Sequence, residues 1–201
     1  MPTLVVATGN AHKTGEIAVM LSGHFDEVLD LRAYPDLTPA EETGDTFEAN
    51  AALKALAIST ALPGALVLAD DSGIEVDALD RRPGVYSARY AGPGATDADN
   101  RHKLLAELSD VGARGPARSA RFRCALVLAQ GGEVLATFDG SVEGVLTNQE
   151  KGSGGFGYDP LFIPEGHCET FGQLPESVKN QFSHRARAMA RLREWLDARI
   201  A

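Results

Sequence analysis

Two long strand-like stretches joined by a glycine pair place the strongest constraint on how this chain folds. Arg118 to Ala129 and Glu133 to Leu146 both have the character of strands, and Gln130-Gly131-Gly132 connects them. A Gly-Gly pair between two such runs is typical of a β-hairpin. We therefore expect a long central hairpin. We further expect this hairpin to carry a second lobe, so that a substrate cleft lies between two lobes.

Strand-like and helical segments alternate along the rest of the sequence. The alternation predicts an α/β fold in which helices flank a mixed central sheet, formed as a single domain by residues 1–201. The expected strands are Thr3–Thr8, Val28–Leu31 and Ala65–Ala69, and the expected helices are Ala11–Leu21, Thr46–Leu62, Asp97–Leu108 and Ser183–Ile200.

Charge and hydropathy argue against nucleic acid and membrane as partners of this protein. The formal net charge of −9 argues against a broad nucleic-acid-binding face, because such faces are usually basic, but it allows a single small-molecule nucleotide held by a local group of donors. The longest apolar run, Cys124 to Ala129, is too short to span a bilayer. The first residues lack the features of an export signal, and the two cysteines form no CxxC pair. We expect a cytoplasmic protein with no membrane partner.

The first cluster of candidate functional residues follows the first expected strand. Thr8-Gly9-Asn10 precedes a helix that carries Lys13 one turn in, and helix N-termini with free N–H groups favour phosphate. The alternative is an ordinary helix start capped by Asn10. One glycine is too few for a Walker loop or for a dinucleotide fingerprint, which makes a dinucleotide oxidoreductase improbable.

A second cluster combines Glu41-Glu42 with Asn50 and Lys54. Asn50 and Lys54 are four residues apart and therefore share one face of the expected helix. This face could offer an amide and an ammonium group to a ligand. A solvated helix face with acidic residues near its start is the alternative.

The third cluster, Asp70-Asp71-Ser72-Gly73, follows a buried strand. Two adjacent carboxylates at such a place are costly unless they bind a cation or a proton. Carboxylate oxygens suit Mg²⁺, and one carboxylate can also orient or deprotonate a water molecule. The alternative is an Asp-rich turn formed by Ser72 and Gly73.

The fourth cluster is split between a glycine-rich loop and the last helix. Phe156, flanked by glycines, is well placed to stack on a base. Lys179 adds a donor before the expected last helix, and His184-Arg185 add donors in its first turn, which Ser183 can cap. The alternatives are a flexible turn whose Phe packs inward and ordinary surface charge.

The motifs in these clusters, taken together, closely resemble those of the inosine triphosphate pyrophosphatase family. The resemblance spans essentially the whole chain. In chain order the motifs are Thr8-Gly9-Asn10-x-x-Lys13, Glu41-Glu-Thr-Gly44, Glu48-Ala-Asn50-Ala-x-x-Lys54-Ala, Asp70-Asp-Ser-Gly73, Tyr86-Ser-Ala-Arg-Tyr90, Gly154-Gly-Phe-Gly-Tyr-Asp-Pro160 and Ser183-His-Arg185.

The resemblance implies a homodimeric, Mg²⁺-dependent enzyme. Such an enzyme converts non-standard purine nucleoside triphosphates (ITP, dITP and XTP) and water to the monophosphate and pyrophosphate, which removes them from the nucleotide pool. By position, Asp71 would be the general base, and Glu41 and Asp71 would hold the metal. The residues implied in substrate binding are Thr8, Gly9, Asn10, Lys13, Lys54, Ser72, Phe156, Gly157, Tyr158, Asp159, Lys179, His184 and Arg185, of which the last two would contact the base.

The mechanism is also reasonable on chemical grounds. The lysines and Mg²⁺ would neutralise the triphosphate charge, which is most of what phosphoryl-type transfer needs. Arginine has only donors, so Arg185 would suit a 6-oxo purine and not the 6-amino group of adenine. A nucleotide-binding sensor without turnover is the alternative function. The Asp70-Asp71 pair argues against it, because a binder gains little from two buried acids facing a polyanion.

Overall fold

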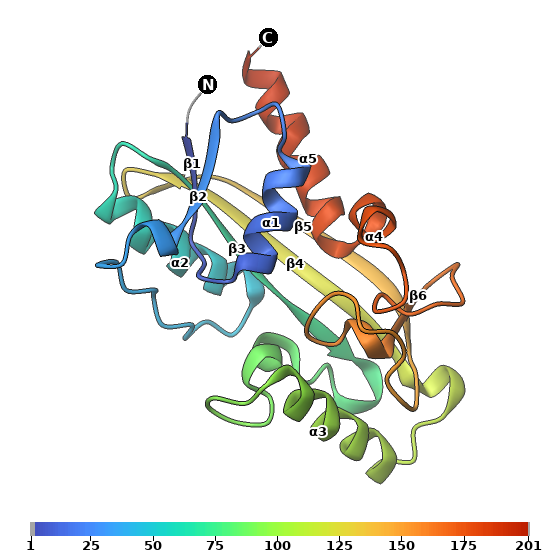
Figure 1. Cartoon of the computed structure of the whole chain (residues 1–201). Coiled ribbons are helices and arrows are strands. Elements are labelled where there is room, and N and C mark those ends of the chain that lie inside the picture. Colours follow the sequence, from blue (N-terminus) through green and yellow to red (C-terminus); the bar gives the residue numbers. More distant parts are fainter. Residues whose placement is uncertain (1–2, 201) are drawn as a thin grey trace. The chain divides into compact units, whose positions relative to one another are not determined.

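The computed structural model describes residues 3–200, with the side chain of residue 200 left out, and shows a mixed α/β architecture (Figure 1). Its six-stranded sheet has the order β2-β1-β3-β4-β5-β6. The strands are β1 (Thr3–Val6), β2 (Glu27–Asp30), β3 (Leu66–Val76), β4 (Ser119–Gln130), β5 (Glu133–Leu146) and β6 (Phe162–Pro164). The α-helices are α1 (Ala11–Met20), α2 (Phe47–Ala61), α3 (Asp97–Asp110), α4 (Glu176–Phe182) and α5 (His184–Ile200). The predicted mixed sheet with flanking helices is confirmed.

Parallel and antiparallel pairings both occur in the sheet. β1 pairs in parallel with β2 and with β3, whereas β5 pairs antiparallel with β6. β4 and β5 are neighbours joined by Gly131 and Gly132, which have φ angles of 59° and 82°. Two consecutive residues with positive φ form the turn that matches the twist of a two-residue hairpin, and glycine adopts it without strain. The predicted central hairpin is therefore confirmed.

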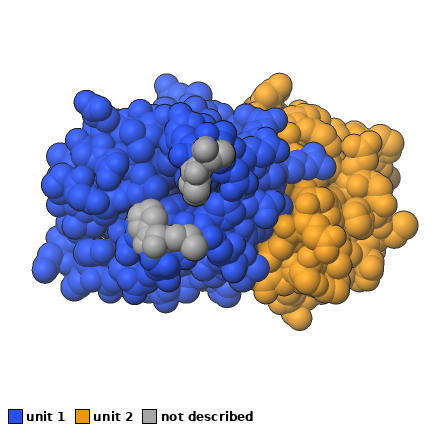
Figure 2. Space-filling view, turned by 90° about the horizontal axis from the view of Figure 1, so that it is seen from above, with its two compact units in different colours: residues 1–71, 124–140, 185–201 blue, residues 72–123, 141–184 orange. Residues whose placement is uncertain are grey.

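The chain divides into two compact units, coloured in Figure 2. The first unit comprises residues 1–71, 124–140 and 185–201, and the second comprises residues 72–123 and 141–184. The treatment of residues 1–201 as one domain stays a prediction.

The first unit has its core between strands and two helices. Alternate residues of β1, β3 and β4 share one face, and on that face Leu4, Leu68 and Leu126 pack with Ile17 of α1 and Leu192 of α5. Figure 1 shows α1 and α5 together, with α2 apart from them across the strands. Helix α2 begins at an N-cap, Thr46, whose side chain accepts the N–H of Ala49, and this cap stabilises the helix start.

The second unit has a separate core rich in aromatic residues. Phe122, Phe162 and Phe171 pack against one another, with ring centroids 4.8 Å, 6.0 Å and 5.4 Å apart in the three pairs. Helix α3 contributes Leu104 and Leu108 to this core. A capping box at Thr96 and Asp99 fixes the start of α3.

One boundary differs from the sequence prediction in a way that matters for the site. The strand expected to end at Ala69 continues as β3 to Val76, so residues 70–73 lie within a strand. The alternative that Asp70-Asp71-Ser72-Gly73 forms a turn is therefore wrong. The strand-ending interpretation relied on the turn preference of Ser and Gly, which the sheet pairing overrides.

Candidate active site

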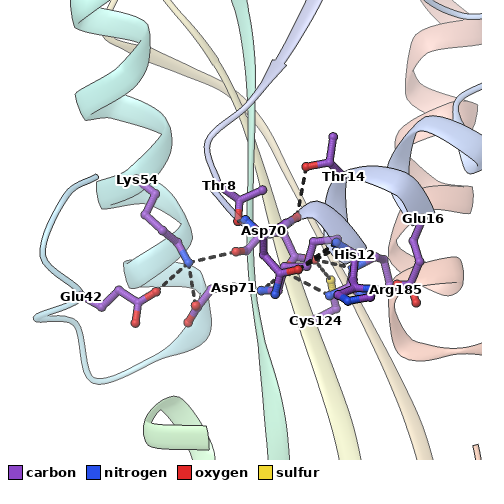
Figure 3. A network of polar contacts seen from close by, with 12 residues as sticks. Thr8, His12, Thr14, Glu16, Glu42, Lys54, Asp70, Asp71, Cys124 and Arg185 are labelled. Carbon is purple, nitrogen blue, oxygen red and sulfur yellow. Dashed lines mark hydrogen bonds and ion pairs between the residues drawn. The ribbon is translucent and has the colours of Figure 1, made fainter. Parts of the chain in front are cut away.

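The two adjacent aspartates of β3 have different partners on the two sides of the strand. Asp70 is 1% exposed and Asp71 is 6% exposed. Successive side chains of a strand point to opposite faces. Figure 3 shows the result: Asp70 lies with Cys124 and Arg185, and Asp71 lies with Lys54 and Glu42. Each carboxylate therefore has its own electrostatic environment.

Asp70 is surrounded by positively charged groups. Its Oδ1 lies 2.6 Å from the Nζ of Lys13, and its Oδ2 accepts a hydrogen bond of 2.9 Å from the Nε of Arg185. The thiol of Cys124 also contacts Oδ2, at 3.2 Å. Burial alone would raise the pKa of Asp70, but Arg185 and Lys13 outweigh it and hold the pKa well below its ordinary value. Asp70 therefore stays ionised.

Arg185 has no exposed surface. Besides its contact with Asp70, its Nη1 donates to Oε2 of Glu16, which is buried on α1. Burial acts to lower the pKa of Arg185, but the two carboxylates outweigh it and raise the pKa. In this structure the guanidinium group is thus held by two carboxylates. The expectation that it contacts a purine base stays a prediction.

Asp71 shares the ammonium group of Lys54 with Glu42. The Nζ of Lys54 lies 2.7 Å from Oδ1 of Asp71, 3.0 Å from Oε1 of Glu42 and 2.9 Å from the backbone oxygen of Asp70. Burial would lower the pKa of Lys54, but the two carboxylates raise it, so Lys54 is charged. Burial raises the pKa of Asp71, and Lys54 only partly opposes this while Glu42 adds to it.

The second oxygen of Asp71 fits a cation. Oδ2 is buried and has no hydrogen-bond partner among the described residues, which is unusual for a carboxylate oxygen and leaves a ligand position open. No group of three or more His, Cys, Asp or Glu side chains that could hold a metal occurs in the described part of the chain. A single carboxylate oxygen of this kind is a ligand that Mg²⁺ accepts, because this ion takes one or two carboxylates and completes its shell with water and phosphate.

Glu41 and Glu42 differ in their relation to this carboxylate. Glu41 is exposed, and no hydrogen bond or ion pair joins it to Asp71 within residues 3–200. Glu42 is the acidic residue that approaches Asp71, through Lys54. The metal role of Glu41 stays a prediction, and the geometry makes Glu42 a second candidate.

The loop before α1 combines a helix cap with exposed polar groups. Asn10 is the N-cap of α1, and its Oδ1 accepts the N–H groups of His12 and Lys13. The Oγ1 of Thr8 accepts the N–H of Asn10 at 3.1 Å. Asn10 therefore caps the helix, as the alternative expected, and this cap does not decide whether the loop binds phosphate. Gly9 and Asn10 are exposed, and phosphate binding by this loop stays a prediction.

Asn50 is buried, as is Lys54 one turn later on the same helix. It has no exposed surface, and its Oδ1 accepts the N–H of Gly44 at 2.7 Å. A Cβ on Gly44 would lie 2.9 Å from that oxygen. Asn50 thus fixes the loop that carries Glu41 and Glu42. The interpretation of Asn50 as a ligand-facing amide stays a prediction.

In the second unit, the glycine-rich loop is organised around Asp159. Its Oδ2 accepts the N–H of Phe156 at 3.0 Å and the Nζ of Lys179 at 2.7 Å. The ammonium group of Lys179 also lies 4.9 Å from the ring centroid of Phe156, within cation–π range. Gly155 has φ 69°, and a Cβ there would lie 2.0 Å from Oδ2 of Asp159, so only glycine fits.

The remaining predicted residues of this unit are largely buried. Tyr158 donates its hydroxyl to the backbone oxygen of Ser87 at 2.8 Å. The imidazole of His184 stacks on Phe122 with centroids 4.8 Å apart. Ser72 is partly exposed. Phe156 and Gly157 are half-buried, whereas Gly154 and Gly155 of the same loop are exposed.

Two residues of α3 hold this loop and were missed from the sequence. Oδ2 of Asp97 accepts the N–H of Gly157 at 2.7 Å, and Nη1 of Arg101 donates to the backbone oxygen of Gly157 at 2.8 Å. Arg101 also pairs with Glu150 at 2.9 Å. Their spacing of four residues shows only that they share a helix face. The partner loop is 56 to 60 residues away, which no local pattern reveals.

Fold and clusters together define a mixed α/β protein whose buried lysines and carboxylates suit a phosphate-rich ligand. The comparisons with known proteins give the particular family. The sequence pattern of the Ham1 family matches residues 4–195, and the chain belongs to this family.

Relatives and solved structures agree over nearly the whole length. A dITP/XTP pyrophosphatase of Geobacter sulfurreducens is 47% identical over 98% of this chain and 97% of its own, and one of Halalkalibacterium halodurans is 44% identical over 98% and 100%. The structure of the Staphylococcus aureus Ham1 protein matches with a TM-score of 0.84 at 38% identity, covering 98% of this chain and 99% of that one. A HAM1 protein from Coxiella burnetii matches with 0.86 at 34% identity, covering 98% and 100%.

Proposed function

We propose that this protein hydrolyses non-standard purine nucleoside triphosphates (ITP, dITP and XTP) to the monophosphate and pyrophosphate. The observation that carries the proposal is the pairing of Asp71 with Lys54 in a chain similar over its full length to dITP/XTP pyrophosphatases. A buried carboxylate with one free oxygen, beside lysines that attract phosphate, is what water activation at a polyphosphate needs.

We assign each residue of the proposed site a part in binding or catalysis. Lys13 and Lys54 neutralise phosphate charge, and the Thr8–Asn10 loop offers donors to the same ligand. Asp71 accepts the proton of the attacking water, a role that its raised pKa favours. Asp70 holds Lys13 in place. Phe156 stacks on the base, and Ser72, Gly157, Tyr158, Asp159, Lys179, His184 and Arg185 complete the substrate contacts.

The proposed cofactor is Mg²⁺. Asp71, with Glu41 or Glu42, would hold it, and the ion supplies Lewis-acid polarisation of the phosphates. Removal of divalent ions with EDTA should abolish turnover, and Mg²⁺ should restore it better than Ca²⁺, which tolerates looser geometry. Full activity in EDTA would contradict this part of the proposal.

A pyrophosphate-release assay on a nucleotide panel tests the activity. Phosphate should be detected from ITP, dITP and XTP only when inorganic pyrophosphatase is added, because the enzyme releases pyrophosphate and not phosphate. ATP should be a poor substrate. Tight nucleotide binding without any product would instead support the sensor alternative.

The place of action and the assembly are part of the proposal. We propose a cytoplasmic homodimer, as the family resemblance implies. No helix within residues 3–200 has the length and apolar character needed to span a membrane. Light scattering coupled to size-exclusion chromatography should give twice the mass of one 21.3 kDa chain. A monomer at micromolar concentration would contradict the dimer.

A further inference from the structure

A cavity in the second unit lies where α3 ends. Its volume is about 400 Å³, and its wall includes Ser109, Arg114, Arg118 and Asn148. Leu105 and Ala113 supply an apolar side. None of these residues belongs to the site proposed above.

Arg118 is the most unusual feature of this cavity. The side chain is 5% exposed, and its Nε and Nη2 donate to the backbone oxygens of Leu146 and Thr147 at 2.8 Å and 2.6 Å. No carboxylate pairs with its guanidinium group, and its Nη1 makes no hydrogen bond, within the described residues. Burial lowers the pKa of Arg118, and no neighbouring negative charge opposes this.

The surroundings of Arg118 differ from those of the other buried arginine, Arg185, in their carboxylates. Arg185 is also buried, but it contacts the carboxylates of Asp70 and Glu16. A buried cation without a counter-charge is destabilising. Arg118 therefore has no anionic partner among residues 3–200.

A second cation faces the same cavity. Arg114 is exposed, and its side chain has no carboxylate partner in the described part of the chain. Ser109 and Asn148 add a hydroxyl and an amide, which can both donate to an oxyanion. Two arginines, a hydroxyl and an amide around one cavity are the donor set that phosphate and carboxylate groups require.

We propose that this cavity is a binding site for a small oxyanion, a phosphate or carboxylate compound, held by Arg118 and Arg114. The bound anion supplies the missing counter-charge of Arg118. The apolar wall formed by Leu105 and Ala113 accommodates the organic part of an ester or an acid. The proposal goes beyond the proposed hydrolysis and does not depend on it.

Titration followed by amide NMR tests the site without measuring activity. Inorganic phosphate and citrate are titrated separately at constant ionic strength, with chloride as reference, so that the two arms distinguish a phosphate from a carboxylate ligand. Saturable shifts of the Gly112 and Ala113 amides in either arm, absent with chloride, support the proposal. Shifts confined to residues 8–13, or none that saturate, overturn it.

Two substitutions at Ser109 provide a second test with a matched control. Ser109 is exposed in the last turn of α3, so Ser109→Glu can place a carboxylate in the cavity without removing Arg118. This variant should weaken anion binding at least about tenfold and raise the Tm in anion-free buffer. The isosteric Ser109→Gln should bind as the wild type does. Equal anion binding in all three proteins would overturn the proposal.

Discussion

The Nε of Arg185 lies 2.9 Å from Oδ2 of Asp70, and neither side chain is exposed to solvent. A buried pair of this kind adds little net stability compared with an apolar pair, but the loss of one partner leaves an uncompensated charge. We expect Arg185→Ala to lower the free energy of unfolding by about 3–5 kcal/mol. Denaturant unfolding followed by circular dichroism measures this.

Arg191 is the control for that substitution, since it lies on the same helix and pairs with Asp139 at the surface. Arg191→Ala should cost at most about 1 kcal/mol. If the two variants are equally stable, the loss of Arg185 does not leave a destabilising buried charge.

A base-reading role of Arg185 should be tested with Arg185→Lys, which keeps the charge. At matched folded fractions this variant should weaken ITP hydrolysis more than ATP hydrolysis.

The two aspartates of β3 should respond in opposite ways to the same substitution. Asp71→Asn should lower kcat at least about a hundredfold, because a general base contributes about 10²- to 10⁴-fold. Its unfolding free energy should stay unchanged or rise, since the folded state raises the pKa of Asp71 and thus disfavours its charge. Steady-state kinetics and denaturant unfolding measure the two effects.

Asp70→Asn should mainly lower stability, because Lys13 and Arg185 lose their common carboxylate. Its effect on kcat should be smaller than that of Asp71→Asn. A greater loss of kcat in Asp70→Asn would mean that the two catalytic assignments are reversed. Full kcat in both variants would show that neither aspartate is the base.

Asp30 should contribute to the acid stability of the protein. Hydrogen bonds from Arg32, and from Thr14, lower its pKa from the ordinary value of 3.8 to about 2. A lowered carboxyl pKa stabilises the folded state above the unfolded pKa, and this contribution is lost as the pH falls from about 4 to about 2. Asp30→Asn should therefore cost about 1–2 kcal/mol at pH 7, allowing for screening at the exposed Arg32, and progressively less as the pH falls to about 2.

The measurement is the difference in unfolding free energy between wild type and Asp30→Asn across this pH range. Asp36, which is exposed, is the control position, and Asp36→Asn should show no such pH-dependent difference. A constant difference from pH 7 to pH 2 would mean that Asp30 stabilises by packing and not by its charge.

Phe156→Ala should weaken binding of all purine nucleotides by about 1–3 kcal/mol, because stacking does not distinguish between bases. KM and direct nucleotide titration measure the loss. Tyr86, which is 56% exposed, provides a matched aromatic control whose alanine variant should bind normally. A loss restricted to one base would contradict simple stacking by Phe156.

The residues that hold the Phe156 loop should affect substrate binding only by fixing the position of this loop. Asp97→Ala removes the acceptor of the Gly157 N–H group and should raise KM with little change in kcat, because Asp97 touches the loop and not the reacting atoms. Asp99→Ala, at the capping box of the same helix, controls for damage to α3. A lower kcat with unchanged KM would contradict this positioning role.

Local pattern was enough to predict most of the elements, but it could not predict long-range pairing. Gly131-Gly132 predicted the hairpin because its chemistry lies entirely within a few residues. Lys54 and Asp71 lie 17 residues apart and Arg185 and Asp70 lie 115 apart, so no local pattern could reveal these pairs. Residue types therefore indicated a polar site, but not which carboxylate meets which cation. The short helix α4 was missed because seven residues carry little periodic signal.

The length of β3 matters more than its composition. Because neighbouring side chains of a strand alternate between faces, a deletion of one residue between Leu66 and Ala69 would move each later residue of the strand to the opposite face. Asp71 would then take the place of Asp70 beside Lys13 and Arg185, and Ser72 would take the place of Asp71 beside Lys54. Both aspartates would remain in the chain, but the carboxylate with an open oxygen would be replaced by a hydroxyl. Apolar substitutions in this stretch are therefore tolerable where a change of even one residue in its length is not.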